Sequence, residues 1–245
     1  MQRRLTPEHM DHPDATREEL AAALDFIRSV NRRLGGVRAT LRPLQRWAER
    51  WPKDAPIRIL DIGTGAADIP HAIVQWARAN DRRVHVTAID FHPTTLDLAR
   101  ELVGDDPDIT LLQADALQLT DRFQPGDFDY AHAAMFLHHL PEIEVMTVLR
   151  VMDRLASRGV IWNDLIRSRL AWLGIRLLTL GRPAPVRHDA RVSVDAGFTR
   201  AEVLDLARRV GLDYTRYHAG MLTQRFILAG EKTTAGFPPA VARGS

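Results

Sequence analysis

The chain has 245 residues, of which 45% are hydrophobic, so it can bury a full core in one large domain or two small ones. Its formal net charge is +2, and its cations, nearly all arginines, are interleaved with 31 acidic residues instead of forming a basic stripe. We therefore expect no nucleic-acid partner. Cysteine is absent, which excludes disulfides, thiolate metal sites and cysteine nucleophiles, and we predict no metal site.

The N-terminus lacks the apolar segment of a signal peptide. The longest apolar stretch, 170–180, is interrupted by Arg176 and falls far short of the ~20 residues that a membrane span needs. We therefore expect a cytoplasmic protein without a transmembrane helix.

Two helices are predicted before the first strand. A capping box of Thr16 and Glu19 opens a helix over 17–34, which Gly35 and Gly36 end, and its apolar residues recur at helical spacing. A second helical stretch continues to about Trp51, with Pro43 either opening or kinking it. We interpret residues 1–52 as a helical lid.

From residue 57 onward, short β-rich runs alternate with helical windows, which is typical of a doubly wound α/β sheet. We predict one domain over 53–230, with two closing strands that bring a mostly parallel, Rossmann-like sheet to seven, and a flexible tail over 231–245. The predicted strands are Ile57–Asp61, Val84–Asp90, Ile109–Asp115, Phe128–Ala134, Val160–Asn163, Leu212–Tyr217 and Gln224–Ala229.

A connection of unusual length, 164–199, follows the fifth predicted strand. It is interpreted as an insertion that covers the acceptor of a reaction. After it, Thr199 and Glu202 form a second capping box, which opens a helix that runs to Arg209 and stops at Gly211.

The strongest local signal is a glycine turn between a strand and a helix, which carries Asp61 and Asp68 and is followed by Asp90 at the end of the next strand. Two carboxylates beside a pyrophosphate are unfavourable, so the turn disfavours NAD. A ligand with a sulfonium and an ammonium group would be attracted by the same carboxylates, so it fits the acidic turn. A glycine turn without ligand, with Asp68 capping its helix, is the alternative.

Four motifs in this region resemble motifs I to IV of class I S-adenosylmethionine-dependent methyltransferases, in the family order and at family spacing across about 110 residues. The family usually has glycine where this chain has Ala67, and a methyl group there would shift the amino-acid end of the cofactor. The motifs are Asp61-x-Gly63-x-Gly65, Asp90, Ala114-Asp115-Ala116, and Phe128-Asp129 leading to Phe136-Leu137-His138-His139-Leu140.

The resemblance implies roles for individual residues toward S-adenosylmethionine. Asp61 and the backbone of Gly63 to Gly65 would hold the methionine moiety, and Asp90 would bind both ribose hydroxyls. The adenine would lie against Asp115, Ala116 and Phe91, and Ala134 would offer backbone near the sulfonium.

Methyl transfer requires a held acceptor and, for a phenol-type oxygen, a base. His139 and His188 are the candidate bases, with a backbone-tying histidine and a solvated loop histidine as their alternatives. His138, Asn163, Asp164 and Trp172 are the candidate acceptor contacts, because they follow the fourth and fifth strands or lie on the insertion.

These observations predict methyl transfer to a small aromatic or polyketide-like acceptor, most readily to oxygen. The alternatives are carbon methylation of a quinone-type acceptor and a noncatalytic S-adenosylmethionine-binding assembly protein. An RNA or protein methyltransferase would need a basic face or an added recognition domain, and neither is evident in the sequence. A homodimer is one option for the oligomeric state, which the sequence leaves open.

Overall fold

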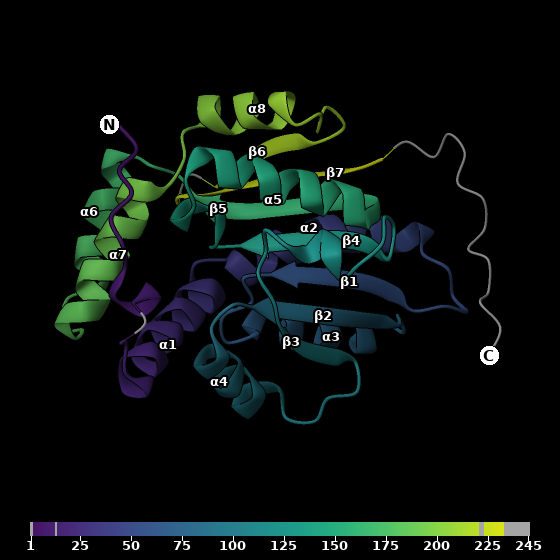
Figure 1. Ribbon diagram of the computed structural model, residues 1–245, viewed down its shortest axis with the longest axis horizontal. Helices are drawn as coiled ribbons and strands as arrows, with labels where there is room; N and C mark the ends of the chain where they lie inside the picture. Colours follow the sequence, from purple (N-terminus) through teal and green to yellow (C-terminus); the bar gives the residue numbers. More distant parts are fainter. Residues whose placement is uncertain (1, 13, 221–222, 233–245) are drawn as a thin grey trace.

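The computed structural model describes residues 2–12, 14–220 and 223–232, and it shows a seven-stranded sheet with helices on both faces (Figure 1). The strand order is β3-β2-β1-β4-β5-β7-β6; the first five strands pair in parallel, and β7 is antiparallel to both of its neighbours. The predicted Rossmann-like fold class is confirmed. The strands are β1 (Ile57–Ile62), β2 (Val84–Asp90), β3 (Ile109–Gln113), β4 (Phe128–Ala134), β5 (Ala156–Leu165), β6 (Arg216–Gly220) and β7 (Arg225–Glu231).

The predicted strand Leu212–Tyr217 is wrong in its bounds, because β6 begins only at Arg216. Leu212 is buried, as expected for a strand. However, the N–H of Thr215 donates to the carbonyl of Leu212 at 3.0 Å, and this bond closes a turn. The apolar residue that suggested a strand is therefore an anchor for the turn that precedes it.

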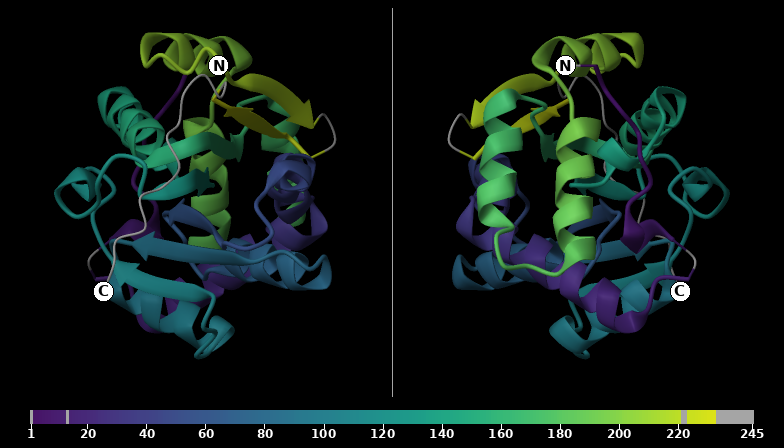
Figure 2. Two further views of the ribbon diagram at one scale, coloured as in Figure 1. Left: turned by 90° about the vertical axis from the view of Figure 1, so that its right-hand side faces the viewer. Right: turned by 90° about the vertical axis from the view of Figure 1, so that its left-hand side faces the viewer.

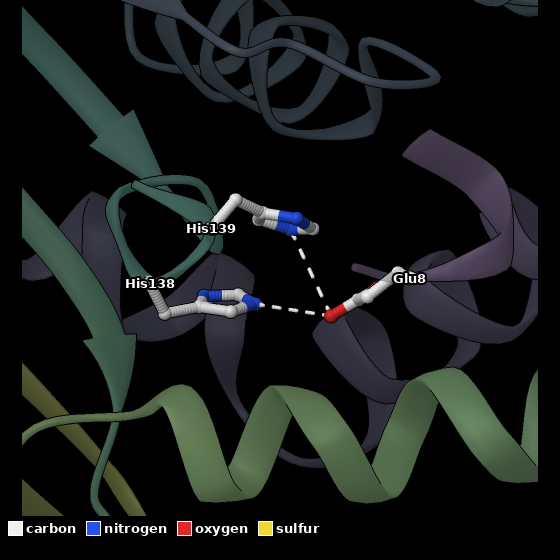
Figure 3. A group of neighbouring side chains, drawn as sticks. All are labelled: Glu8, His138 and His139. Atoms are coloured by element: carbon white, nitrogen blue, oxygen red, sulfur yellow. Dashed lines mark ion pairs between the residues drawn. The ribbon is translucent and has the colours of Figure 1, made fainter. Parts of the chain in front are cut away.

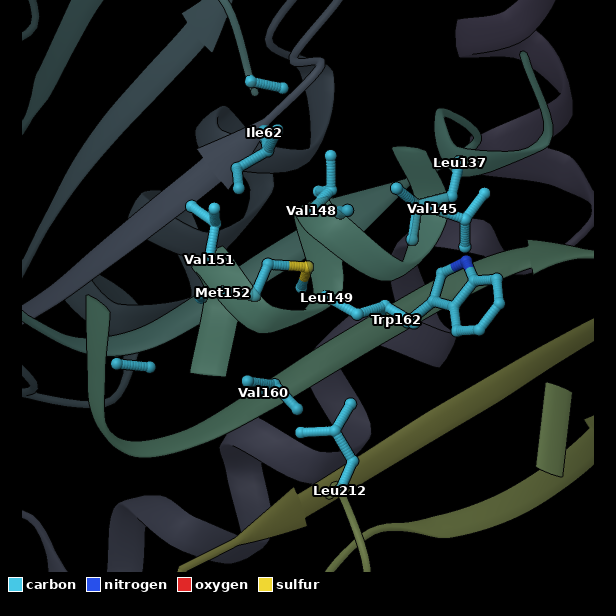
Figure 4. Close-up of a cluster of buried hydrophobic side chains, with 14 of the residues drawn as sticks. Ile62, Leu137, Val145, Val148, Leu149, Val151, Met152, Val160, Trp162 and Leu212 are labelled. Atoms are coloured by element: carbon cyan, nitrogen blue, oxygen red, sulfur yellow. The ribbon is translucent and has the colours of Figure 1, made fainter. Parts of the chain in front are cut away.

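Each face of the sheet has its own hydrophobic core, and the side chains of β1 point into the two cores in turn. Ile57 and Ile59 point into one core, and Leu60 and Ile62 point into the other. The second core, shown in part in Figure 4, packs the sheet against α5 and α8. The helices are α1 (Arg17–Arg33), α2 (Gly36–Trp47), α3 (Asp68–Ala79), α4 (Pro93–Val103), α5 (Glu142–Leu155), α6 (Arg169–Leu178), α7 (Ala184–Ala196) and α8 (Arg200–Arg209).

Both predicted capping boxes are present and fix the starts of α1 and α8. The prediction of a two-helix lid is wrong for α2. Leu44 and Trp47 of α2 are buried in the first core, and the Trp47 ring stacks on Tyr130 of β4 at 5.0 Å. Pro43 lies inside this helix. Helix α2 therefore covers the sheet, and only α1 remains near the predicted acceptor side.

The predicted insertion 164–199 is a pair of helices and not an irregular loop. It begins after β5, which extends to Leu165 because it pairs with β7 along its whole outer half. Helices α6 and α7 then lie side by side and, with α1, gather at one end of the sheet (Figures 1 and 2).

No helix within the described ranges has the length and apolar character needed to cross a bilayer. Of the predicted tail, residues 233–245 lie outside the described residues.

Candidate active site

A cavity of about 590 Å³ lies at the carboxyl ends of β1, β2 and β4. Its walls come from the glycine turn after β1, the loops after β2, β3 and β4, and α1. An N-terminal segment, residues 2–12, which we call the strap, contributes Leu5 to Glu8, Met10 and Asp11. Ligand sites of open α/β sheets lie at this edge, where the strand order reverses.

The glycine turn is shaped by backbone conformations that side chains disfavour. Gly63 has a φ of +68° and Gly65 a φ of +54°. A Cβ on Gly63 would lie 2.4 Å from Cγ of Phe136, which belongs to the loop after β4. The turn therefore needs glycine at 63 both for its backbone angle and for its contact with that loop.

Ala67 keeps the left-handed conformation that glycine would adopt easily, with a φ of +56°. Its methyl group is fully buried with Ala99 and Val103 of α4 and does not line the cavity. The expectation that this methyl group shifts the cofactor is therefore wrong, because the side chain points away from the ligand side of the turn.

Two carboxylates, the buried Asp61 and the half-buried Asp68, face the cavity beside this turn. Asp61 is 2% exposed and accepts a hydrogen bond from Nδ1 of His132, and Asp68 accepts one from Nδ2 of Asn31 at 3.0 Å. Burial, and next the charge of Asp61, raise the pKa of Asp68 despite the bond from Asn31. A cationic ligand would relieve this destabilisation of the charged carboxylates, so the site fits a sulfonium and an ammonium group.

Two further buried polar atoms beside the turn have no hydrogen-bond partner among the described residues: Oγ1 of Thr64 and Oδ1 of Asn31. Both residues line the cavity. Unpaired buried polar atoms are costly, so these two atoms are suited to bind the polar end of a ligand.

The next strand ends place three more of the predicted cofactor residues on the cavity. The carboxylate of Asp90 accepts N–H groups from Gly65 and His92, each at 3.0 Å, and burial raises its pKa. Asp115 accepts the N–H of Leu117 at 2.9 Å, and the ring of Phe91 is 71% exposed on the cavity wall. The arrangement offers carboxylate oxygens for hydroxyl groups and a ring for a flat ligand.

The fourth strand ends in a strained turn at the centre of the cavity. Ala134 lines it, and Met135 follows with a φ of +53°, a rare value for a residue with a side chain. The N–H of Met135 donates to the carbonyl of Asn163 at 2.9 Å. This turn leads into the short 3-10 helix η4 (Leu137–His139), which directs His138 and His139 to the cavity.

The strap carboxylate of Glu8 faces both histidines, whose rings lie side by side (Figure 3). Its Oε1 is 3.7 Å from Nε2 of His138 and 4.0 Å from Nε2 of His139. Each histidine uses its other nitrogen on a second carboxylate: His138 on Asp164 at 2.7 Å, and His139 on Asp11 at 2.8 Å. We call Glu8, Asp11, His138, His139 and Asp164 the histidine cluster.

Charges within the histidine cluster shift the pKa of its members. Burial disfavours the protonated form of His138, but Asp164 and Glu8 raise its pKa to about 10. His139 is partly buried, which disfavours its protonated form, but the charge of Glu8 and the hydrogen bond to Asp11 raise its pKa against the charge of His138. Burial alone would raise the pKa of Glu8, but the two histidines hold it below its ordinary value.

The two histidines differ in access to the cavity. The side chain of His138 is 2% exposed, whereas that of His139 is 18% exposed. His139 is therefore the member of the pair that an acceptor can reach. Glu8, His138 and His139 also offer three ligand atoms within 4.8 Å of one another, so the same three residues could hold a metal ion.

The strap is fastened at both ends. The guanidinium of Arg3 donates to the carbonyls of Ala196, His138 and Leu140 at 2.8 to 3.0 Å. Farther along, the carboxylate of Asp189 on α7 accepts the N–H groups of His9 and Met10. These bonds hold Glu8 and Asp11 over η4.

A smaller apolar pocket of about 60 Å³ adjoins the main cavity on the far side of the histidine cluster. We call it the annex. Both spaces share Glu8, His138 and His139 in their walls, and the other side chains around the annex are mainly apolar and come from α1, α6 and α7. They include Phe26, Ile27, Val30, Ile175, Val186, Ala190 and Val194.

Two predicted acceptor contacts on β5 do not line the cavity. Asn163 is fully buried and donates to the carbonyl of Gly36 and to Oγ1 of Thr40, each at 3.1 Å. Asp164 is also fully buried, and its carboxylate is hydrogen-bonded to His138, Trp162 and the N–H of Leu165. Because β5 continues past them, they lie behind the cavity wall, and direct contact with an acceptor is excluded in this conformation.

The structure also places two predicted residues of the insertion away from the cavity. His188 is exposed on α7 and packs against His9, while its neighbour Asp189 turns inward to the strap. Trp172 on α6 lines neither space and lies under the guanidinium of Arg176 at 4.6 Å. Adjacent residues of a helix face different directions. The sequence indicates only a long connection here, so it does not separate the direction of His188 from that of Asp189.

Sequence reasoning missed the strap and the partners of the predicted residues. Glu8 and Asp11 stand in an acidic, histidine-containing segment that suggested only the absence of a signal peptide. Asn31 is a polar residue on the apolar, buried face of α1, in line with Leu20 and Leu24, and His132 occupies an interior position of a strand. No spacing in the sequence links these residues to their partners.

The comparisons with known proteins agree with this architecture. Residues 59–159 match the family model for a methyltransferase domain. Over 117 residues the chain is 28% identical to the demethylmenaquinone methyltransferase of Staphylococcus aureus, a match that covers 46% of each protein. The chain thus spans about half the length of the curated relatives it matches.

Two solved structures share the fold at low sequence identity. The magnesium protoporphyrin IX methyltransferase of Synechocystis, solved with bound S-adenosylhomocysteine, is 15% identical with a TM-score of 0.56, over 82% of this chain and 85% of that one. An S-adenosylmethionine-dependent methyltransferase of Aquifex aeolicus is 16% identical with a TM-score of 0.51, over 76% and 88%. Residues 59–159 thus match a methyltransferase domain, as the sequence predicted, and the chain shares its Rossmann-like fold with S-adenosylmethionine-dependent methyltransferases.

Proposed function

We propose that the chain is a methyltransferase that transfers the methyl group of S-adenosylmethionine to the oxygen of a small aromatic or polyketide-like acceptor with an apolar substituent. The observation that carries this proposal is one cavity that joins the acidic glycine turn to the histidine cluster, with the apolar annex sharing the same histidines in its wall.

The glycine-turn side of the cavity would hold the cofactor. Asp61 and Asp68 suit its cationic groups, Asp90 its ribose hydroxyls, and Asp115 with Ala116 and Phe91 its adenine. The backbone of Gly63 and Gly65 would approach the methionine moiety, and Ala134 the sulfonium. The cofactor, when bound, supplies an electrophilic methyl group.

The histidine cluster would prepare the acceptor. His139 is the accessible histidine, and its Nε2 would accept the proton of an acceptor hydroxyl group as the oxygen approaches the methyl carbon. A raised pKa brings this imidazole closer to the pKa of a phenol, about 10, so the proton transfer costs little. Glu8 would position His139 and balance its charge, and His138 would help to hold Glu8 in place. In this proposal His188 has no catalytic part, and Asn163, Asp164 and Trp172 act only through packing.

The annex supports an acceptor with an apolar substituent. Its aliphatic and aromatic walls begin beside His139, so a substituent on the ring would enter it when the hydroxyl group meets the histidine. Burying each CH₂ group there favours binding by about 0.8 kcal/mol.

Carbon methylation of a quinone-type acceptor is the second candidate, because the curated relative in Staphylococcus aureus is a demethylmenaquinone methyltransferase. A base beside the methyl position would serve an enol carbon as well as a phenol oxygen. A noncatalytic binding protein is disfavoured by the accessible histidine in the same cavity.

The test is turnover of phenols and hydroquinones of graded pKa and alkyl chain length, with products analysed by mass spectrometry and NMR. We expect O-methylated products and a preference for alkylated acceptors. His139→Ala should lower turnover by roughly 10²–10⁴ while cofactor affinity stays constant, and the loss should shrink with more acidic acceptors. His85→Ala, at the far end of β2, is the matched control. Carbon-methylated products would favour the second candidate, and the absence of S-adenosylhomocysteine formation with every acceptor would contradict both.

A further inference from the structure

Helix α6 and the turn after it carry a concentration of exposed apolar side chains. Of the eight large hydrophobic side chains that are exposed among the described residues, five are leucines between 170 and 180, with 47% to 71% of their surface accessible. We call them the leucine face; its members are Leu170, Leu173, Leu177, Leu178 and Leu180. Scattered exposed leucines need no explanation, but a contiguous group marks an interaction surface.

The helix is apolar on both sides. Its inner side packs Ile175 against Phe26, Val30 and Val186, which closes the annex. Its outer side presents the leucine face at the periphery of the molecule, where Figures 1 and 2 show α6 beside α7. A helix that is hydrophobic all round is normally buried all round, whereas the outer side of α6 has no partner among the described residues.

The charges around the leucine face have one sign. Arg169, Arg176, Arg182 and Arg187 are exposed on α6, on α7 and in the turn that joins them, and no aspartate or glutamate occurs between residues 165 and 188. The rest of the chain interleaves both signs, so this is a local departure. Apolar residues fringed by arginines are complementary to a surface that is negative outside and apolar within.

We propose that the leucine face docks α6 in the plane of an anionic lipid bilayer, with the leucines among the acyl chains and the arginines at the headgroups. The annex lies directly behind this helix, so docking would bring the pocket for an apolar substituent next to the lipid. Only this last step rests on the proposed function, since vesicle binding needs neither cofactor nor acceptor.

The test is flotation of the full chain with vesicles of phosphatidylcholine alone and with about 30% phosphatidylglycerol, a content that gives a clear negative surface potential. The wild type should float with the anionic vesicles and weakly with the neutral ones. The double variant Leu173→Glu/Leu177→Glu should lower the partition coefficient by about tenfold or more, because two side chains leave the acyl region. Ile143→Glu, an equally exposed apolar residue on α5, is the matched control and should float like the wild type.

A second variant separates electrostatic attraction from apolar insertion and guards against misfolding. Arg169→Gln/Arg176→Gln should lose the preference for anionic vesicles while keeping weak binding to both kinds. All variants should bind S-adenosylhomocysteine like the wild type in calorimetry, so a failure of the docking proposal is distinguishable from a failure of the proposed function. Equal flotation of the leucine variant and the control would overturn the proposal. The proposal would also be overturned if ultracentrifugation without lipid detected a dimer of the wild type and the leucine variant were a monomer.

Discussion

Each carboxylate oxygen of Asp90 accepts one backbone N–H group, Oδ2 that of Gly65 and Oδ1 that of His92, and each can accept a further hydrogen bond from a ligand hydroxyl group. Asp90→Ala should weaken S-adenosylhomocysteine binding by about 1.5–3 kcal/mol, or roughly 10- to 150-fold, the range for hydrogen bonds to a charged group. Calorimetry measures this directly. Asp97→Ala, an exposed carboxylate on α4, is the control, and equal binding by both variants would refute the ribose assignment.

Gly63 combines a left-handed backbone with a close neighbour, and these two effects can be separated. Gly211 also has a positive φ, +82°, but nothing lies within 4 Å of a Cβ there. Gly211→Ala should therefore cost only the conformational penalty of about 1–2 kcal/mol. Gly63→Ala meets the Phe136 ring as well, so denaturant unfolding should give a larger loss, and the folded variant should bind S-adenosylhomocysteine poorly. Similar losses of stability in both variants would mean that Phe136 moves aside freely.

The carboxylates beside His139 determine the pH at which it can accept a proton. Their charge raises its pKa, and only the deprotonated ring is a base, so kcat/KM should rise with pH through a value above the 6.5 of an ordinary histidine. Glu8→Gln and Asp11→Asn each remove a charge that favours the protonated ring, so each should move this rise to lower pH. The shift should be larger for Glu8→Gln, whose charge has the larger effect. A pH profile unchanged in both variants would exclude His139 as the titrating base.

At the scale of elements, the strap is held onto the fold by a few polar contacts. Arg3 donates to four backbone carbonyls, and its guanidinium lies 4.3 Å above the ring of Phe198. Arg3→Ala should shift the strap toward open forms by about 1.5–3 kcal/mol, because hydrogen bonds from a charged group are lost. Limited proteolysis within residues 2–12 should become faster, and turnover should fall while cofactor affinity changes little.

Arg4→Ala provides the matched control for the strap, because the side chain of Arg4 is exposed and only its N–H group contacts the fold, at the carbonyl of Asp195. Its proteolysis and turnover should match those of the wild type. If Arg3→Ala behaves in the same way, the bonds of Asp189 to His9 and Met10 are sufficient to hold the strap.

At the scale of the whole molecule, the histidine cluster joins the strap, the turn after β4 and the end of β5. Three carboxylates and two imidazoles meet there, and the charge of the carboxylates favours the protonated form of both imidazoles, raising the pKa of His138 to about 10. A divalent ion would have to displace these protons before it could bind. We therefore expect EDTA to leave turnover unchanged. Loss of activity with EDTA that Zn²⁺ restores would instead identify Glu8, His138 and His139 as metal ligands.

The sequence by itself determined the elements whose signals are local. Strand bounds such as Val84–Asp90 and Phe128–Ala134 and both capping boxes were predicted correctly, because alternation of apolar residues and helix caps depend on neighbours in the chain. The glycine turn and its acidic residues were recognisable for the same reason, and they indicated the cofactor. The start of β6 was not predicted correctly, because a buried apolar residue such as Leu212 is compatible with either a turn or a strand.

Only the tertiary structure decided which polar residues meet. Glu8 lies 130 residues before His138 in the chain, yet both face one cavity, and nothing in either segment encodes that approach. The same holds for the direction of side chains on the insertion. Once 164–199 forms two helices, Asp189 faces the strap while His188 faces outward, and β5 buries Asn163 and Asp164 behind the wall. The cofactor side of the site was thus predictable from local pattern, whereas the acceptor side depends on packing between distant segments.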